Sequence, residues 1–232
     1  MPYFYYDPTC LLLLPAILLA LYAQGRVRTT YAKFAKIGNR RGLTGADVAR
    51  RILDRNGLTH VRVERISGNL TDHYDPRANV VRLSGDVHDN ASIAAVGIAA
   101  HEVGHAVQHN TGYVPIKVRN TVLPVAQIGS SLAIPLVIIG IIFSAFEVLI
   151  PVGIILYTAV VAFQLATLPV ELNASRRALT SVYEIGFLDE EETKGAKKVL
   201  SAAALTYVAA AASAILQLLR LLLLAGNNRR RD

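Results

Sequence analysis

The residues of this chain best suited to chemistry lie in the run His101-Glu102-Val103-Gly104-His105, which has the pattern HExxH. On a helix, two histidines four positions apart lie on the same face, because four residues turn the chain by about 400°. Both imidazoles can therefore bind one metal ion, and the neighbouring carboxylate can take a proton from water bound to that ion. The run predicts a zinc peptidase site in which His101 and His105 are metal ligands and Glu102 is the catalytic base.

A catalytic zinc ion needs a third protein ligand and one position left for water. In metzincin peptidases a histidine ten residues after the first one supplies it, but that position is Thr111 here. His109 lies on the same predicted helix as the other two histidines, and three ligands on one straight helix converge poorly on a tetrahedral ion. We therefore expect His109 to be a helix-end histidine and the third ligand to come from another element.

Glu171 is the best candidate for that ligand, because it directly follows an apolar segment of membrane length. An ionised carboxylate beside such a segment is costly unless it is paired or bound to a cation. One alternative is an ion pair with Arg176 or Arg177. Glu147 is a second carboxylate among apolar residues, but the topology expected from the basic residues puts it at the opposite membrane face.

The rest of the sequence has the composition of a membrane protein. Hydrophobic residues make up 53% of the 232 residues, and the mean hydropathy is +0.38. A helix needs about 20 apolar residues to cross a bilayer, and apolar blocks of roughly this length recur along the chain. They predict a mainly α integral membrane protein with about four transmembrane helices around a water-facing unit. Together with the HExxH run and the basic residues described next, we expect this unit to be a small α+β zincin-like metallopeptidase unit in the cytoplasm. The blocks are Thr9–Ala23, Val122–Ser144, Leu149–Val170 and Leu200–Ala225.

The basic residues predict how the chain is oriented in the membrane. No Lys or Arg precedes Arg26, and six lie between Arg26 and Arg41, which places the N-terminus outside and the following chain in the cytoplasm. The first block lacks a basic start and a small-residue cleavage site, so we expect a retained anchor. The aromatic run Tyr3–Tyr6 suits the membrane interface in front of it.

The second and third blocks predict a membrane hairpin, because Asn120–Ser175 contains no Lys or Arg. Such a hairpin leaves the cytoplasm and returns to it, which brings Glu171 to the membrane face that carries His105. The fourth block is also expected to span, although Arg220 lies inside it and Arg229–Arg231 would then lie outside.

These patterns divide the chain into five parts. Residues 1–25 form an anchor, residues 26–120 a soluble unit with the HExxH helix, and residues 121–170 a transmembrane hairpin. Residues 171–199 form a helix with the third ligand and a cytoplasmic segment, and residues 200–232 form a last transmembrane helix with a basic tail.

The soluble unit carries signals for two strands and a first helix. Thr44 is a suitable N-cap for a helix that ends near Gly57. The residues of Val61–Ile66 alternate between apolar and charged, as in a half-buried strand. Asn79–Ser84 predicts a second short strand. By likeness to zinc peptidases, in which an edge strand before the metal helix binds extended substrate by strand addition, it is a candidate for that role, and an ordinary core strand is the alternative, compatible with it.

The HExxH helix should begin at a cap formed by Asp89 or Asn90 and end near Asn110–Gly112. Gly104, inside the motif, would let another backbone or side chain approach closely.

Charge and cysteine content argue against other classes. The net charge is +7, but the basic residues crowd the ends of the apolar blocks, where they suit anionic lipid headgroups, and no basic stretch is interleaved with aromatic residues as nucleic-acid binding would require. The single cysteine, Cys10, excludes an intramolecular disulfide and a cysteine-rich zinc site. Asp72, Asp75 and Asp86 are expected to serve turns and caps rather than a cation.

Two motifs together resemble a known family. The sequence HEVGHAVQ from His101 to Gln108 and the sequence LPVELNASRR from Leu168 to Arg177 are similar to those of the bacterial membrane-bound neutral zinc metallopeptidases of the YugP-like family. The resemblance covers nearly the whole chain and implies an integral membrane hydrolase with one catalytic zinc ion in a gluzincin-type site. The implied site residues are His101, His105 and Glu171 as ligands and Glu102 as base.

The expected reaction is hydrolysis of a peptide bond. Zinc lowers the pKa of its bound water toward about 7, and Glu102 takes the proton as this water attacks the carbonyl and then passes it to the leaving amine. A second donor to the oxyanion is usual, and the sequence does not choose among the candidates. We expect the substrates to be membrane proteins or unfolded segments near the bilayer. The candidate donors are His73, Tyr183, Arg176 and Arg177.

Two other hypotheses stay open. The chain could be a non-catalytic membrane scaffold in which zinc has four protein ligands, with His109 or His73 as the fourth. The site could also lie outside, with every span reversed, although the basic cluster between Arg26 and Arg41 argues against this orientation.

Overall fold

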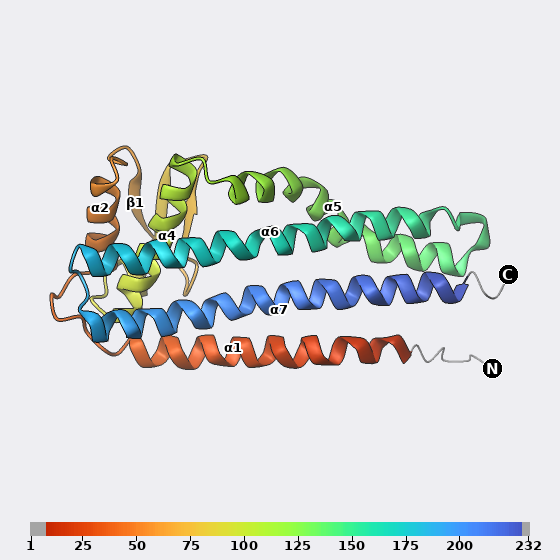
Figure 1. The fold of residues 1–232 in the computed structure, drawn as a ribbon, viewed down its shortest axis with the longest axis horizontal. Coiled ribbons are helices and arrows are strands. Elements are labelled where there is room, and N and C mark those ends of the chain that lie inside the picture. Colours follow the sequence, from red (N-terminus) through yellow and green to blue (C-terminus); the bar gives the residue numbers. More distant parts are fainter. Residues whose placement is uncertain (1–7, 229–232) are drawn as a thin grey trace. The chain divides into compact units, whose positions relative to one another are not determined.

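The computed structural model describes residues 8–228, so the predictions for Tyr3–Tyr6 and Arg229–Arg231 lie outside the described residues. Over residues 8–228 the chain is mainly helical and has one small sheet of three strands (Figure 1). It forms two compact units. The described parts of Met1–Tyr22, Lys117–Leu168 and Thr206–Asp232 make up the first unit, and Ala23–Ile116 with Pro169–Leu205 make up the second.

Four long helices run through the described chain, and each contributes residues to both units. Each of them is long and apolar enough to cross a membrane, the first together with the short helix η1 (Pro8–Leu13) before it. The expected number of candidate spanning helices is therefore confirmed by length and composition. A second short helix, η2 (Ser144–Phe146), lies between the middle two. The long helices are α1 (Leu14–Phe34), α5 (Val114–Ile142), α6 (Leu149–Glu184) and α7 (Glu190–Asn228).

Small residues let α5 and α6 pack closely within the first unit. A Cβ atom added to Gly129 would lie 2.4 Å from the carbonyl oxygen of Leu156, and one added to Gly153 would lie 2.6 Å from that of Ala133. In lipid, where no hydrophobic force drives helices together, such close backbone contact is a main source of association. These two glycines therefore hold α5 and α6 as neighbours.

Local sequence signals set the elements of the second unit. Helix α2 (Gly45–Arg55) begins at the predicted cap, because the Thr44 hydroxyl accepts a hydrogen bond from the Asp47 amide while the Asp47 carboxylate accepts one from the Thr44 amide. The two predicted strands are confirmed, and a third strand between them was not predicted. The remaining short elements are β1 (Arg62–Ile66), β2 (His73–Asp75), β3 (Val80–Ser84) and α3 (Gly85–His88).

Strand β3 lies at the centre of the sheet rather than at its edge. The strand order is β1-β3-β2, with β1 parallel to β3 and β2 antiparallel to it, so that Tyr74 lies opposite Val81. The side chains of Val80, Val81 and Leu83 are fully buried. The prediction that Asn79–Ser84 binds substrate by strand addition is therefore wrong, since both of its sides already pair with other strands.

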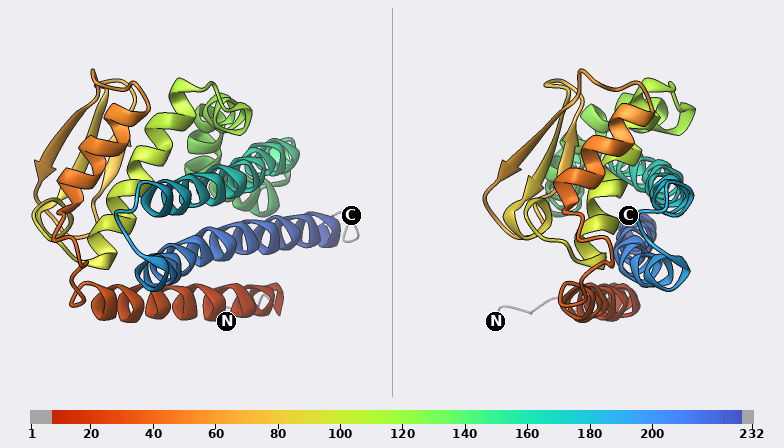
Figure 2. Two further views of the ribbon diagram at one scale, coloured as in Figure 1. Left: turned by 60° about the vertical axis from the view of Figure 1, so that its left-hand side comes forward. Right: turned by 90° about the vertical axis from the view of Figure 1, so that its left-hand side faces the viewer.

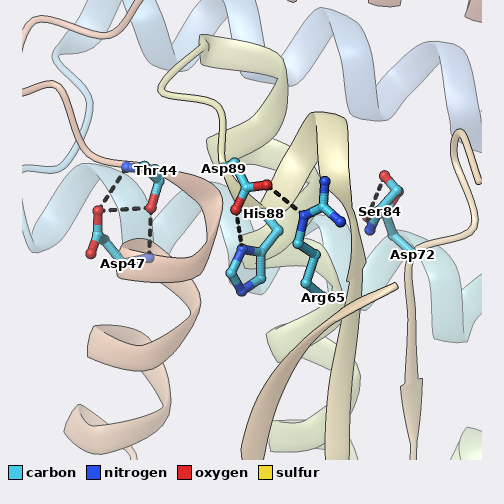
Figure 3. Close-up of polar contacts among 7 residues, drawn as sticks. All are labelled: Thr44, Asp47, Arg65, Asp72, Ser84, His88 and Asp89. Carbon is cyan, nitrogen blue, oxygen red and sulfur yellow. Dashed lines mark hydrogen bonds and ion pairs between the residues drawn. The ribbon is translucent and has the colours of Figure 1, made fainter. Parts of the chain in front are cut away.

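Helix α4 (Ile93–Asn110), which carries the HExxH run, begins later than predicted. Its N-cap is Ser92, whose hydroxyl accepts a hydrogen bond from the backbone amide three residues on. Asp89 instead follows α3, and its carboxylate binds the side chains of Arg65 and the adjacent histidine (Figure 3). The prediction of a cap at Asp89 or Asn90 is therefore wrong, because Ser92 caps the helix and the Asp89 carboxylate pairs with Arg65 of β1. The predicted end of the helix is confirmed.

In the second unit, α4 lies between the sheet and the parts of α6 and α7 that belong to this unit (Figure 2). Most of its side chains are buried, among them Val96 and Val103, and the same core includes Leu53 of α2 and Leu83 of β3. A helix that is apolar on nearly every side must be covered on every side. This packing fixes the rotation of α4 about its axis and so the direction of its few polar side chains.

Candidate metal centre

The two histidines of the HExxH run lie side by side on α4. The ring centroids of His101 and His105 are 4.8 Å apart, and their side chains are 13% and 14% exposed. The spacing of four residues on a helix gives this shared face directly. Glu102, one position along, is 9% exposed. A helical element thus presents two nitrogen donors together and a buried carboxylate beside them.

Helix α6 brings the third predicted residue to this face, and a glycine makes the approach possible. A Cβ atom at Gly104 would lie only 2.8 Å from the carbonyl oxygen of Ala174 and 3.2 Å from its Cα atom. Real Cβ atoms do not tolerate such contacts with a backbone, so any larger residue would push the two helices apart. The close approach predicted for Gly104 is confirmed, and its partner is the turn of α6 that follows Glu171.

Glu171 lies against both imidazoles. Its Oε2 atom is 3.3 Å from Nε2 of His101 and 3.5 Å from Nε2 of His105, and its side chain is 6% exposed. One donor atom from each of the three residues can be chosen so that all lie within 4.8 Å of one another. Residues from two separate helices therefore form a single three-donor group.

The chemistry of this donor set fits zinc. Two imidazole nitrogens and one carboxylate oxygen form one of the usual ligand sets of catalytic zinc, and a tetrahedral ion then keeps its fourth position for water. Such nitrogen-rich sets are unlike the all-oxygen sets that Ca²⁺ and Mg²⁺ prefer. The three residues brought together are thus able to hold zinc with one position left over.

Both histidines also have partners at their second ring nitrogen, which the sequence reasoning missed. The Ser175 hydroxyl lies 3.1 Å from Nδ1 of His101, and Oε1 of Gln108 lies 3.0 Å from Nδ1 of His105. Hydrogen bonds of this kind orient a metal-binding histidine and leave the other nitrogen for the metal. Helical spacing contained the signal, because Gln108 follows His105 by three positions and Ser175 follows Glu171 by four.

Electrostatics at the site favour a protonated His105 when no metal competes. Burial by itself lowers the pKa of this imidazole, but the hydrogen bond with Glu171, the negative charges of Glu102 and Glu171, and the contact with Gln108 raise it by more. The pKa of His105 therefore lies above its usual value. The carboxylate of Glu171, which contacts Nε2 of His105, stabilises a positive charge at this place. The charge can be that of a protonated imidazole or that of a bound cation.

The other histidines considered as ligands lie outside the three-donor group of the described residues. His73 is exposed on β2, and its Nδ1 atom is 2.8 Å from the carbonyl oxygen of Thr71. His109 is at the end of α4, where its ring meets the ring of Tyr74 edge-on at 5.7 Å. The expectation that His109 is a helix-end histidine is confirmed.

The remaining candidates for an oxyanion donor lie along α6. Arg176 and Tyr183 line a cavity of about 540 Å³ between α6 and α7, together with Ser175 and Lys197. Arg177 donates a hydrogen bond from Nε to the side chain of the residue four positions before it. A second oxyanion donor therefore remains a prediction without a chosen residue.

The predicted turn role is confirmed for Asp75, whereas Asp72 binds a residue twelve positions further along the chain instead of a turn or cap of its own. The Asp72 carboxylate accepts hydrogen bonds from the backbone amide and the hydroxyl of Ser84 (Figure 3). Asp75 accepts two backbone amides of the turn after β2 and pairs with Arg82. Burial raises the pKa of Asp72, whereas the hydrogen bond from Arg82 lowers that of Asp75.

A membrane-type helical chain with a two-histidine, one-carboxylate group has the features of a membrane metallopeptidase, and comparison with known proteins agrees. Residues 9–226 match the model of a family described as "Putative neutral zinc metallopeptidase", and the chain belongs to this family. It is 47% identical over 190 residues to a protein of Bacillus subtilis (strain 168) named "Putative membrane protease YugP", covering 82% of this chain and 84% of that protein. No solved structure matches the chain.

Proposed function

We propose that this protein is a membrane-bound zinc endopeptidase in which His101, His105 and Glu171 hold the metal and Glu102 is the general base. The observation that carries the proposal is the convergence of a carboxylate from α6 on two histidines of α4 in a mostly buried group. Membership of a zinc metallopeptidase family supports the same assignment. Pairing of Glu171 with Arg176 or Arg177 is less favoured, since Oε2 of Glu171 lies within 3.5 Å of both histidines.

Zinc held by these three residues would supply Lewis acidity, which would make water a nucleophile near neutral pH and polarise the carbonyl of a peptide bond. Glu102 takes a proton from the attacking water as the new carbon–oxygen bond forms. The same carboxyl group then gives that proton to the amide nitrogen as the carbon–nitrogen bond breaks. Contacts with Gln108 and Ser175 hold the rings of His105 and His101, and the packing of Ala174 on Gly104 holds the turn of α6 that follows Glu171.

The peptide substrate is proposed to pair with β2 rather than with β3. Strand β2 is an edge strand that pairs with β3 through residues His73–Asp75. It is also the edge strand beside α4, where Tyr74 touches His109. An extended peptide can add to an exposed sheet edge through main-chain hydrogen bonds.

The active site is proposed to face the cytoplasm of a bacterial cell, with membrane proteins or unfolded segments near the bilayer as substrates. The motivation is the basic cluster between Arg26 and Arg41, which follows the first apolar block. A cysteine placed at Gly112 in a variant lacking Cys10 tests the side. Labelling by a membrane-impermeant thiol reagent is expected only after the cells are opened, and labelling in intact cells would indicate the reversed topology.

Replacement of Glu102 by Gln tests the catalytic assignment. The purified variant is expected to keep its zinc but to cleave an unfolded casein-like substrate at least about 100-fold more slowly, the lower end of what general acid–base catalysis contributes. Glu147→Gln is the matched control, because it neutralises the other carboxylate among apolar residues. Undiminished proteolysis by the Glu102 variant would exclude this mechanism.

The scaffold hypothesis makes a different prediction about coordination. X-ray absorption of the zinc-loaded protein should show three protein ligands and one exchangeable water if the site is catalytic. Four protein ligands would instead indicate a closed structural site. His73→Ala and His109→Ala provide a second test, because neither substitution should change the zinc content of a catalytic site formed by the three donors alone.

A further inference from the structure

We infer that Gln108 is a positioning residue that fixes the tautomer of His105 and ties this ligand to the turn of α6 that carries Glu171. The inference deepens the proposed function and rests on it, because it concerns how the zinc ligands are held. Gln108 is fully buried in α4, with no exposed surface. A primary amide buried to this degree is costly unless its hydrogen bonds are made, so its contacts identify what it does.

The orientation of the Gln108 amide follows from its partners. Its Nε2 atom lies 2.8 Å from the carbonyl oxygen of Val170 and 3.0 Å from Oδ1 of Asn173. A backbone carbonyl can only accept a hydrogen bond, so the NH₂ group must point toward Val170. The amide oxygen of Gln108 therefore points the other way, toward Nδ1 of His105 at 3.0 Å.

The tautomer of His105 follows from that orientation. An amide oxygen can only accept a hydrogen bond, so Nδ1 of His105 must carry the proton. In a neutral imidazole this leaves the lone pair on Nε2, the atom that faces Glu171. The backbone carbonyl of Val170 thus determines, through one side-chain amide, which nitrogen of His105 can bind a metal.

The same amide also links the two helices that supply the ligands. Val170 and Asn173 stand directly before and two positions after Glu171 on α6. Asn173 is itself held by Nε of Arg177, which donates to the same Oδ1 atom at 2.8 Å. Gln108 therefore contacts one metal ligand and both flanks of another, so a shift of either helix would disturb His105 and Glu171 together.

The contact at the other histidine does not impose a tautomer. Nδ1 of His101 meets the hydroxyl of Ser175 at 3.1 Å, and a hydroxyl can donate or accept. Either proton position on His101 is therefore compatible with this partner. The difference predicts that loss of the Gln108 amide weakens metal binding more than loss of the Ser175 hydroxyl.

The test compares zinc binding in the full-length protein, wild type and Gln108→Met, in lipid nanodiscs. Methionine keeps the length and flexibility of glutamine but offers neither the donor nor the acceptor. Competition with a chelator at one fixed pH should show about 10–100-fold weaker zinc binding, the range expected for loss of an outer hydrogen-bond partner. Ser175→Ala should show a smaller loss.

A second readout follows the proton itself. In zinc-loaded wild-type protein with ¹⁵N-labelled histidine, the Nδ1–H of His105 should be slow to exchange with water and visible by NMR. In Gln108→Met this signal should disappear. Val107→Ala is the matched control, since it removes buried apolar volume from the adjacent position on α4 without touching the polar contacts.

The possible results distinguish the role of Gln108 from the peptidase function itself. Wild-type zinc affinity and a retained His105 signal in Gln108→Met would overturn the positioning role while leaving the proposed peptidase intact. An equal loss of zinc affinity in Val107→Ala would also overturn it, because the effect would then come from general loosening of α4. Absence of zinc binding by the wild-type protein would overturn the proposed function and this inference together.

Discussion

Helices α4 and α6 supply one three-donor group, but different kinds of information place their ligands. In α4 a capping serine, an apolar sequence and two histidines four residues apart lie within one short stretch. In α6 a single carboxylate, Glu171, follows an apolar run and reaches the histidines where Ala174 packs on Gly104. Two of the three candidate ligands are therefore set by local sequence, whereas the position of the third depends on helix packing.

The largest effect is expected from removing a ligand on either helix. If Glu171 binds zinc directly, as the histidines are proposed to do, Glu171→Ala and His105→Ala should have similarly large effects. Each should weaken zinc binding by more than roughly 100-fold, the upper range for losing a residue that only hydrogen-bonds to a ligand. Zinc content of the purified variants, measured by atomic absorption, checks this. Glu147→Ala serves as the control for loss of a carboxylate among apolar residues. Full zinc content in Glu171→Ala would assign the site to α4 and some other residue.

The next largest effect concerns the contact that joins the helices. Gly104→Ala would bring a methyl group against the Ala174 backbone, and overpacking of this kind costs about 1–3 kcal/mol. Alanine gains only about 1 kcal/mol over glycine inside a helix, so both stability and zinc affinity should fall. Thermal unfolding and chelator competition measure the two effects.

Gly97→Ala is a matched control for that variant, because the same helix there meets α7 instead of α6. An added Cβ atom at Gly97 would lie 3.2 Å from the Cβ atom of Ala196, a milder contact at a place without ligands. Zinc affinity should stay unchanged in this control. An equal loss of zinc binding in both variants would mean that the Gly104 contact has no special part in placing Glu171.

A smaller effect is expected at the local signal that begins α4. Ser92→Ala removes the side-chain acceptor for the Ala95 amide and should lower the free energy of unfolding by about 1 kcal/mol. Zinc affinity measured on the folded protein should change little, since packing fixes α4 on every side. A loss of zinc binding as large as that of Gly104→Ala would show that the cap, rather than the packing, places the histidines.

The smallest effect is a pH dependence of the metal-free protein. Burial lowers the pKa of His105 in the folded protein. The hydrogen bond with Glu171, the negative charges of Glu102 and Glu171, and the hydrogen bond with Gln108 raise it by more, so the pKa of this residue lies above its usual value. Its protonation therefore stabilises the fold fully below about pH 6.5, the unfolded value, and this stability is lost as the pH rises through the folded pKa. The chelator-treated wild type should lose Tm across this window relative to His105→Gln, and a relative gain would contradict the pKa direction.

Several features of the molecule could be predicted because they depend on neighbours in the sequence. The cap at Thr44, the strands around Val61–Ile66 and Asn79–Ser84, and the four apolar helices all follow from local pattern. Hydrogen bonds at a helix end and burial of one face need only a few consecutive residues. The predictions failed where a side chain binds a residue that is distant in the sequence, as the Asp89 carboxylate binds Arg65.

The position of β3 and the partner of His101 could not be predicted in the same way. Strand order is decided by which edges meet, and the three-residue strand β2 was too short to give a pattern of its own. Glutamine and serine have ordinary roles in most helices. The contact of Ser175 with His101 forms only when α4 and α6 pack together, whereas helical spacing alone places Gln108 beside His105, and only its contacts with Val170 and Asn173 need α6.

The amino-acid pattern was enough to predict one helix with two histidines and a glutamate, long apolar helices beside it, and a charged Glu171 that needs a partner. The packing of the helices establishes that α6 lies against Gly104, that Glu171 meets both Nε2 atoms, and that Gln108 contacts residues of both helices. The physical reason is that helical periodicity acts over a few residues, whereas the meeting of donors from two helices depends on the shape of the packed surfaces between them.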